Sequence, residues 1–146
     1  MTKSADIQVA DAIVAELNAA PSGTFSQTFT ATRVWVPVKD AQDVTSYEVK
    51  VVPMELRTVT LSRETAVEEY DIDVAVQVPC QVDDITTGDE ARYLAEQIRD
   101  FFVRRTLVSP PVAWLKATSK IYSPERLANN NRFLTVITLT YKGARA

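Results

Sequence analysis

The side chains best suited to chemistry in this chain are carboxylates gathered on one segment. Residues 68–78 alternate between apolar and polar types, which is typical of a strand with one buried face. Asp71 and Asp73 therefore share a face, with Glu68 and Glu69 nearby. Paired carboxylates of this kind hold Mg²⁺ in nucleases. Such a site needs a third group that the sequence does not identify, so a polar face turned to solvent or to a channel is the simpler interpretation.

Other reactive side chains are scarce. The chain of 146 residues contains no His, one Cys and three Gly. Without His it lacks the commonest general base and transition-metal ligand, and so few Gly exclude the glycine-rich loops that hold phosphates. Cys80 follows a proline with no base to deprotonate it, which favours a small apolar filler over a nucleophile. We therefore predict no catalytic residue, cofactor or metal, and no enzyme.

Length and composition indicate one domain spanning residues 1–146, and the order of helix, strands, helix and strands along it fits the α+β class. On folding, a chain of this length buries roughly two-thirds of the surface that it exposes when unfolded. The net charge of −3 and the pI near 5.0 argue against a broad basic surface for nucleic acid. No apolar run approaches the ~20 residues of a membrane span, and the first residues lack the order of a signal peptide. We expect a protein that is cytosolic where it is made, with no membrane partner.

The segment Thr87–Arg105 is predicted to be the helix on which the fold is organised. Thr87 is its predicted cap, with Glu90 reaching back to the cap amide, and Arg104 and Arg105 favour its negative end. Apolar residues then recur at steps of three and four, so one face must pack on a sheet or helix. The stripe comprises Ala91, Leu94, Ala95, Ile98, Phe101 and Phe102.

The remaining elements complete a mixed, mainly antiparallel sheet packed by an N-terminal helix and the central helix. The first helix covers Ile7–Leu17, with Ser4 or Asp6 as its cap. In the segment after the two prolines, Trp114 and Lys116 are predicted to share one face and Leu115 and Ala117 the other. The predicted strands are Thr30–Val36, Tyr47–Val52, Glu68–Val78, Val112–Tyr122 and Arg132–Lys142, with a helical turn at Ser123–Leu127.

One stretch, Met54–Val67, permits two interpretations. Its apolar residues are separated by polar ones, and it is β-prone and free of glycine. It forms either a long hairpin that turns near Ser62–Glu64 or a mobile excursion that orders only against a partner. Pro53, just before it, indicates a sheet edge or a strand exit.

In its order of elements and several short stretches, the chain resembles the tail terminator proteins of long-tailed phages, also called tail completion or minor tail proteins. The resemblance covers nearly the whole chain, and it carries no catalytic signature. It rests on the helix Ile7–Leu17, the strands Val34–Pro37 and Val49–Pro53, Arg63 ahead of Glu69–Val74, the central helix, and Tyr122–Glu125 ahead of Phe133–Tyr141.

The resemblance implies a virion protein of the tail or neck that acts by contacts. Its subunits assemble as a hexameric ring that caps the tail tube, stops its polymerisation and joins tail to head. The tail tube protein lies on one face, a head-tail connector on the other, and DNA passes through without specific binding. Candidate interface residues are Trp35, Arg57, Arg63, Glu64, Tyr122 and Arg126. Candidate acidic residues of the channel lining are Asp71, Asp73, Asp83 and Asp84.

Three other functions remain open from the sequence. A different head-tail connector or neck subunit would share the same composition. A small Mg²⁺-dependent nuclease would use Asp71 and Asp73. A generic small-ligand binding module lacks a recognisable pocket motif.

Overall fold

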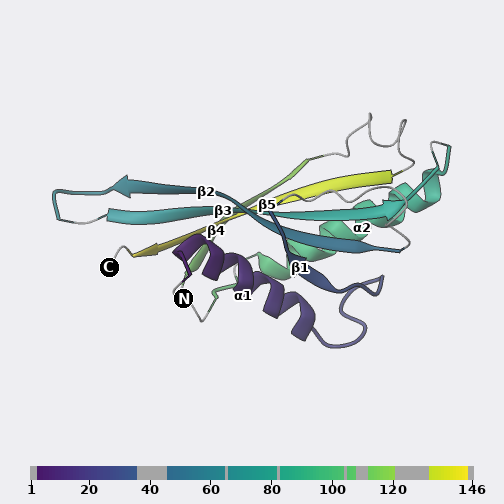
Figure 1. The fold of residues 1–146 in the computed structure, drawn as a ribbon, viewed down its shortest axis with the longest axis horizontal. Helices are drawn as coiled ribbons and strands as arrows, with labels where there is room; N and C mark the ends of the chain where they lie inside the picture. The colour runs from purple at the N-terminus through teal and green to yellow at the C-terminus, as the bar shows by residue number, and fades with distance from the viewer. Residues whose placement is uncertain are drawn as a thin grey trace.

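The computed structural model describes residues 3–35, 46–64, 66–81, 83–103, 105–107, 112–120 and 132–144 (Figure 1). Tyr122, Arg126, Arg104 and the predicted turn Ser123–Leu127 lie outside these ranges. The elements are α1 (Ala5–Ala19), β1 (Ala31–Arg33), β2 (Glu48–Thr60), β3 (Ala66–Pro79), α2 (Ile85–Phe102), β4 (Ala113–Lys120) and β5 (Arg132–Ala144).

The strands form one sheet in the order β1-β2-β3-β5-β4. β1 runs parallel to β2, and the other three pairings are antiparallel. The last strand therefore lies inside the sheet. α1 packs on β1, β2 and β3, and α2 packs on β3 and β5. This mixed sheet with two packed helices confirms the predicted α+β class.

Both helices cover the same face of the sheet, which we call the helix face; the opposite one is the open face. Their buried residues belong to one core together with alternate residues of β2, β3 and β5. Arg105, just after α2, also donates a hydrogen bond of 3.0 Å to Glu16 on α1. The predicted buried face of β3 is confirmed. The core includes Ile13 and Leu17, Leu94, Ile98 and Phe102, Ile72, Val74 and Val76, and Ile137, Leu139 and Tyr141.

The start of α2 differs from the prediction. Asp84 is the cap: its carboxylate accepts hydrogen bonds from the Thr87 amide, at 3.1 Å, and from the Thr87 hydroxyl, at 2.6 Å. The prediction that Thr87 is the cap was wrong, because Asp84 lies three residues earlier and its carboxylate can satisfy the same free amides. At the other end the helix stops at Phe102. Arg105 donates to the Phe101 carbonyl at 3.0 Å, the predicted role of a cation at a helix end.

The edge strand β4 does not alternate strictly. A bulge between Trp114 and Lys116 inserts an extra residue into the pairing with β5. Trp114 therefore packs on the helix face with Ala117, and Lys116 pairs with Thr140 of the open face. The prediction that Trp114 shares a side with Lys116 was wrong, because a bulge shifts the alternation by one residue.

The stretch from Met54 to Val67 is a long hairpin, one of its two predicted forms. β2 continues through Pro53, so the predicted exit there was wrong. Pro53 does lie at an edge of the described sheet, since β1 pairs only as far as Val51. A second bulge, between Pro53 and Glu55, bends β2 at this point. β1 is also shorter than the predicted strand Thr30–Val36.

Candidate assembly surface

The β2–β3 hairpin extends past both helices and forms an arm (Figure 1). We define the arm as residues 54–64 and 66–70. Eight large hydrophobic side chains are exposed in the described ranges, and four lie within the short stretch from Met54 to Leu61. A concentration of this kind marks a surface that contacts another molecule. The four are Met54, Leu56, Val59 and Leu61.

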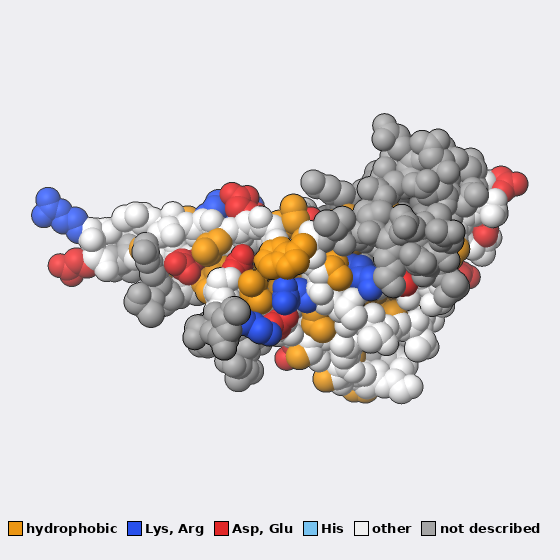
Figure 2. All heavy atoms as spheres, viewed as in Figure 1, with side chains coloured by type: hydrophobic (Ala, Val, Ile, Leu, Met, Phe, Trp, Pro, Cys, Tyr) orange, Lys and Arg blue, Asp and Glu red, His pale blue; other side chains and the backbone are white. Residues whose placement is uncertain are grey.

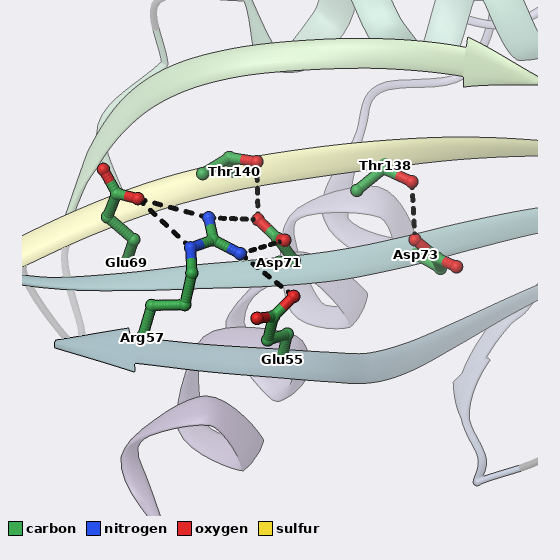
Figure 3. A network of polar contacts seen from close by, with 7 residues as sticks. All are labelled: Glu55, Arg57, Glu69, Asp71, Asp73, Thr138 and Thr140. Atoms are coloured by element: carbon green, nitrogen blue, oxygen red, sulfur yellow. Dashed lines mark hydrogen bonds and ion pairs between the residues drawn. The ribbon is translucent and has the colours of Figure 1, made fainter.

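Arg57 organises a cluster of charged side chains on the open face at the root of the arm (Figure 3). Its guanidinium donates to both carboxylate oxygens of Asp71 and, at 3.2 Å, to Glu69. Glu55 lies 3.1 Å from the same guanidinium. The hydroxyl of Thr140 donates to Asp71 at 2.7 Å. The cluster therefore ties β2, β3 and β5 together across three neighbouring strands.

The charges in this Arg57 cluster do not cancel. The guanidinium beside Asp71 holds the pKa of that carboxyl below its usual range, although partial burial opposes the shift. The same bonds raise the pKa of Arg57. Because one guanidinium faces the carboxylates of Glu55, Glu69 and Asp71, the cluster keeps a net negative charge. The root of the arm is thus held by charge-assisted bonds and remains acidic.

The geometry fits a structural network better than the metal site considered from the sequence. Both oxygens of Asp71 are engaged by Arg57, and Asp73 accepts a hydrogen bond of 2.7 Å from Thr138. A magnesium ion needs carboxylate oxygens that are not held by a cation. In the described ranges, no three His, Cys, Asp or Glu residues are grouped so that they could hold a metal ion.

A shallow apolar groove lies next to the Arg57 cluster on the open face. It has a volume of about 330 Å³ and crosses the arm toward the start of β4. In the space-filling view, hydrophobic side chains appear between acidic and basic ones where the arm joins the body (Figure 2). The lining side chains are Val59, Leu61, Val67, Ala113 and Leu115, bordered by Glu69 and Lys142.

The other candidate interface residues are dispersed. Trp35 is 63% exposed, and the Arg33 guanidinium lies 5.5 Å from its ring centre. Arg63 and Glu64 are exposed in the turn at the tip of the arm. The structure therefore brings Arg57, Arg63 and Glu64 onto one hairpin and leaves Trp35 beyond the end of β1. Their roles as interface residues stay predictions.

The four candidate lining residues do not form one patch. Asp71 and Asp73 lie on β3, and Asp83 and Asp84 follow the far end of that strand, before α2. Asp84 uses its carboxylate to cap α2, and the hydrogen bonds from Thr87 lower its pKa. Asp83 is exposed. Any channel lining would involve two separate acidic sites, and that role remains a prediction for all four.

Sequence reasoning missed the partners of these carboxylates. Thr138 and Thr140 alternate with apolar residues along β5, which predicts a polar face, but the register that places them beside Asp73 and Asp71 is tertiary. On the helix face, the hydroxyl of Tyr141 and the indole N–H of Trp114 are buried with no hydrogen-bond partner among the described residues. Burial raises the pKa of Tyr141.

In the described ranges, no helix combines the length and apolar character needed to cross a membrane. Comparison with known proteins finds no matching family model and no matching curated protein. The fold is similar to that of a chain in a solved structure described as the virion of a native gene transfer agent (GTA) particle. The TM-score is 0.58 at 14% sequence identity, and the match covers 98% of each chain. At this identity the likeness shows a shared fold.

Proposed function

We propose that this protein is a structural subunit of a phage-like virion, and that it acts as a tail terminator. In this proposal its copies form a ring, six-fold as the sequence resemblance implies, that caps the tail tube and stops its polymerisation. One face of the ring binds the tail tube protein and the other binds a head-tail connector. The protein acts through contacts and carries out no reaction.

The observation that carries the proposal is the shared fold with a virion chain over nearly the full length of both proteins. A likeness that leaves almost no residue of either chain unmatched supports a common type of building block. The particle in that structure is a virion, so its chains are assembly components. The resemblance to tail terminators, found from the sequence alone, supports the same class.

The arm gives independent support for an assembly role. Leu56 is 44% exposed and Leu61 is 65% exposed, on a hairpin that no described helix covers. Exposed apolar residues on a projecting element are costly in water unless a partner buries them. A subunit of a closed ring needs two unlike surfaces, and an arm on one side of the sheet supplies one of them.

The acidic open face suits a conduit for DNA. The Arg57 cluster carries a net negative charge, and Asp73 lies on the same face of β3, two residues from Asp71. A wall of like charge keeps a polyanion from adhering during passage. We therefore propose that the open face near Asp71 and Asp73 turns toward the channel.

Loss of the gene in its own particle tests the proposal directly. A missing terminator leaves tail tubes of abnormal length that do not attach to heads, in electron micrographs. Full tails without heads, with correct tube length, would instead assign the protein to the neck. Normal particles would overturn both assignments.

A purified system separates capping from expression effects. Tube protein polymerised with this protein should give tubes whose length falls as the ratio of this protein to tube protein rises. The matched control is the same protein with Leu56 and Leu61 both changed to Ser, which retains the helix-covered core and removes two apolar contacts of the arm. Tubes of unchanged length at every ratio of the native protein would contradict the capping role.

A further inference from the structure

Resting on the ring proposed above, we infer that neighbouring copies join by sheet addition. The outer edge of the arm of one copy, residues 54–58, pairs with the outer edge of β4 in the next copy. The molecule that binds the arm is thus a second copy of this chain. The seam is head-to-tail, because the two edges are unlike.

The first observation is that the described sheet has two different long edges without a strand partner. β1 covers β2 only from Val49 to Val51, so β2 has no described strand beside it along the arm. At the other end of the strand order, β4 (Ala113–Lys120) pairs among the described residues with β5 alone, while Val112 just before it is bonded to Leu107. Unpaired, β-prone edges readily accept another strand, and proteins usually protect them.

The second observation is strand direction. β2, β3, β5 and β4 alternate in direction across three antiparallel pairings, so β2 and β4 run in opposite directions. A neighbour placed in the same orientation therefore presents its β4 antiparallel to the arm, with its helices on the same side. Repetition of this step by rotation gives a closed ring and needs no inversion of the subunit.

The third observation is charge complementarity on the open face. Glu55 is 57% exposed at the side chain and lies at the free edge of β2, although it contacts Arg57. Lys116 is exposed on the open face of β4. Directly opposite positions across an antiparallel pair share a face, so Glu55 can stand opposite Lys116 of the next copy.

Backbone polarity identifies the residue to test. Val34 donates its amide to the Val51 carbonyl, so the backbone groups of Val51 face the free side of β2. These groups alternate along a strand, and the bulge after Pro53 shifts the alternation by one residue. Leu56 then has its amide directed away from β3, toward the proposed neighbour.

The first test compares Leu56→Pro with Leu56→Ala. Proline removes the outward amide and is tolerated at a sheet edge, whereas alanine keeps it. Native mass spectrometry should show the ring for Leu56→Ala and mainly monomers for Leu56→Pro, with unchanged far-ultraviolet circular dichroism in both. Rings of equal abundance in the two variants would overturn the seam.

The second test exchanges charges and does not depend on a proline. Glu55→Lys alone and Lys116→Glu alone should each weaken ring assembly by about tenfold, since each places like charges across the seam. An equimolar mixture should restore rings in which the two variants alternate, because every junction then pairs opposite charges. The two positions within one copy are separated by β3 and β5, so repair within a copy is excluded.

The outcomes separate this seam from the function on which it rests. Native rings that persist in both single charge variants would refute the seam and leave the capping role standing. Absence of rings in the native protein, together with tubes of uncontrolled length, would refute the capping role as well. Rings restored in the mixture but absent in each variant support the seam.

Discussion

The helix-covered body and the arm share strands β2 and β3, yet apolar side chains are buried in the body and exposed in the arm. In the body, Ile98 of α2 is fully buried with Ile137 and Leu139 of β5. In the arm, Leu56 and Leu61 are exposed, beyond the bulge that shifts the alternation of β2 by one residue. Alternation creates an apolar face, but only a covering layer removes it from water. The uncovered half of the sheet is where contacts with other molecules are expected.

The largest expected difference between the two regions is in folding stability. Ile98→Ala leaves a cavity in the core and should lower the free energy of unfolding by about 2–5 kcal/mol. Leu61→Ala should change it by less than about 0.5 kcal/mol, because the side chain is already in water. Denaturant unfolding followed by circular dichroism compares the two. Equal losses would show that the arm belongs to the cooperative core.

A substitution at the root of the arm should have an intermediate effect on the free energy of unfolding. Arg57→Met removes the cation and leaves the carboxylates of Glu69 and Asp71 facing one another, at an expected cost of about 1–2 kcal/mol at neutral pH. Partial exposure of the guanidinium keeps the loss below that of a fully buried pair. Arg57→Lys retains the charge without the paired geometry and should lose less. Chemical denaturation measures both, and equal stability of Arg57→Met and native protein would contradict this role.

Acid should reduce the effect of that substitution. The pKa of Asp71 is lowered in the folded protein, so its stabilisation is complete above the unfolded pKa of about 3.9 and is lost as pH falls through the folded value. The stability gap between native protein and Arg57→Met should therefore narrow as the pH falls below the unfolded pKa of about 3.9. Asp11 and Asp84 also have lowered pKa values, but they are present in both proteins and cancel in the difference. A constant gap would show that Asp71 is not the partner that matters.

A smaller effect distinguishes the two possible caps of α2 in the body. Asp84→Ala removes the acceptor of the Thr87 amide and should cost about 1 kcal/mol. Thr87→Val keeps the amide and loses only the hydroxyl, so its cost should be smaller. Thermal unfolding of the two variants tests the order. A larger loss for Thr87→Val would restore the cap predicted from sequence.

The smallest expected effect lies under the arm, on β5. Tyr141→Phe removes a buried hydroxyl that has no partner among the described residues, so stability should change by less than about 1 kcal/mol and in the favourable direction. Denaturant unfolding provides the measurement, with Phe102→Ala as a control for loss of core volume. A clear loss in Tyr141→Phe would reveal a hydrogen bond to that hydroxyl.

The sequence by itself determined the features that depend on local periodicity. Apolar steps of three and four identify the buried stripe of α2, and strict alternation identifies the inward residues of β3, such as Ile72 and Val74. The sequence also predicted the α+β class, and a long hairpin was one of the two forms that it allowed for Met54–Val67. These features follow from the fixed geometry of helices and strands, so neighbours in sequence are enough to predict them.

Only the tertiary structure decided the features that need register and cover. The bulge beside Lys116 turns Trp114 inward, and the pairing of β2 with β3 brings Arg57 to Asp71, fourteen positions away in sequence. Leu56 and Leu61 are exposed because no helix among the described residues covers the arm. The type of a single residue does not encode such relations, because a one-residue shift in strand register or a missing covering layer reverses the environment of the same side chain.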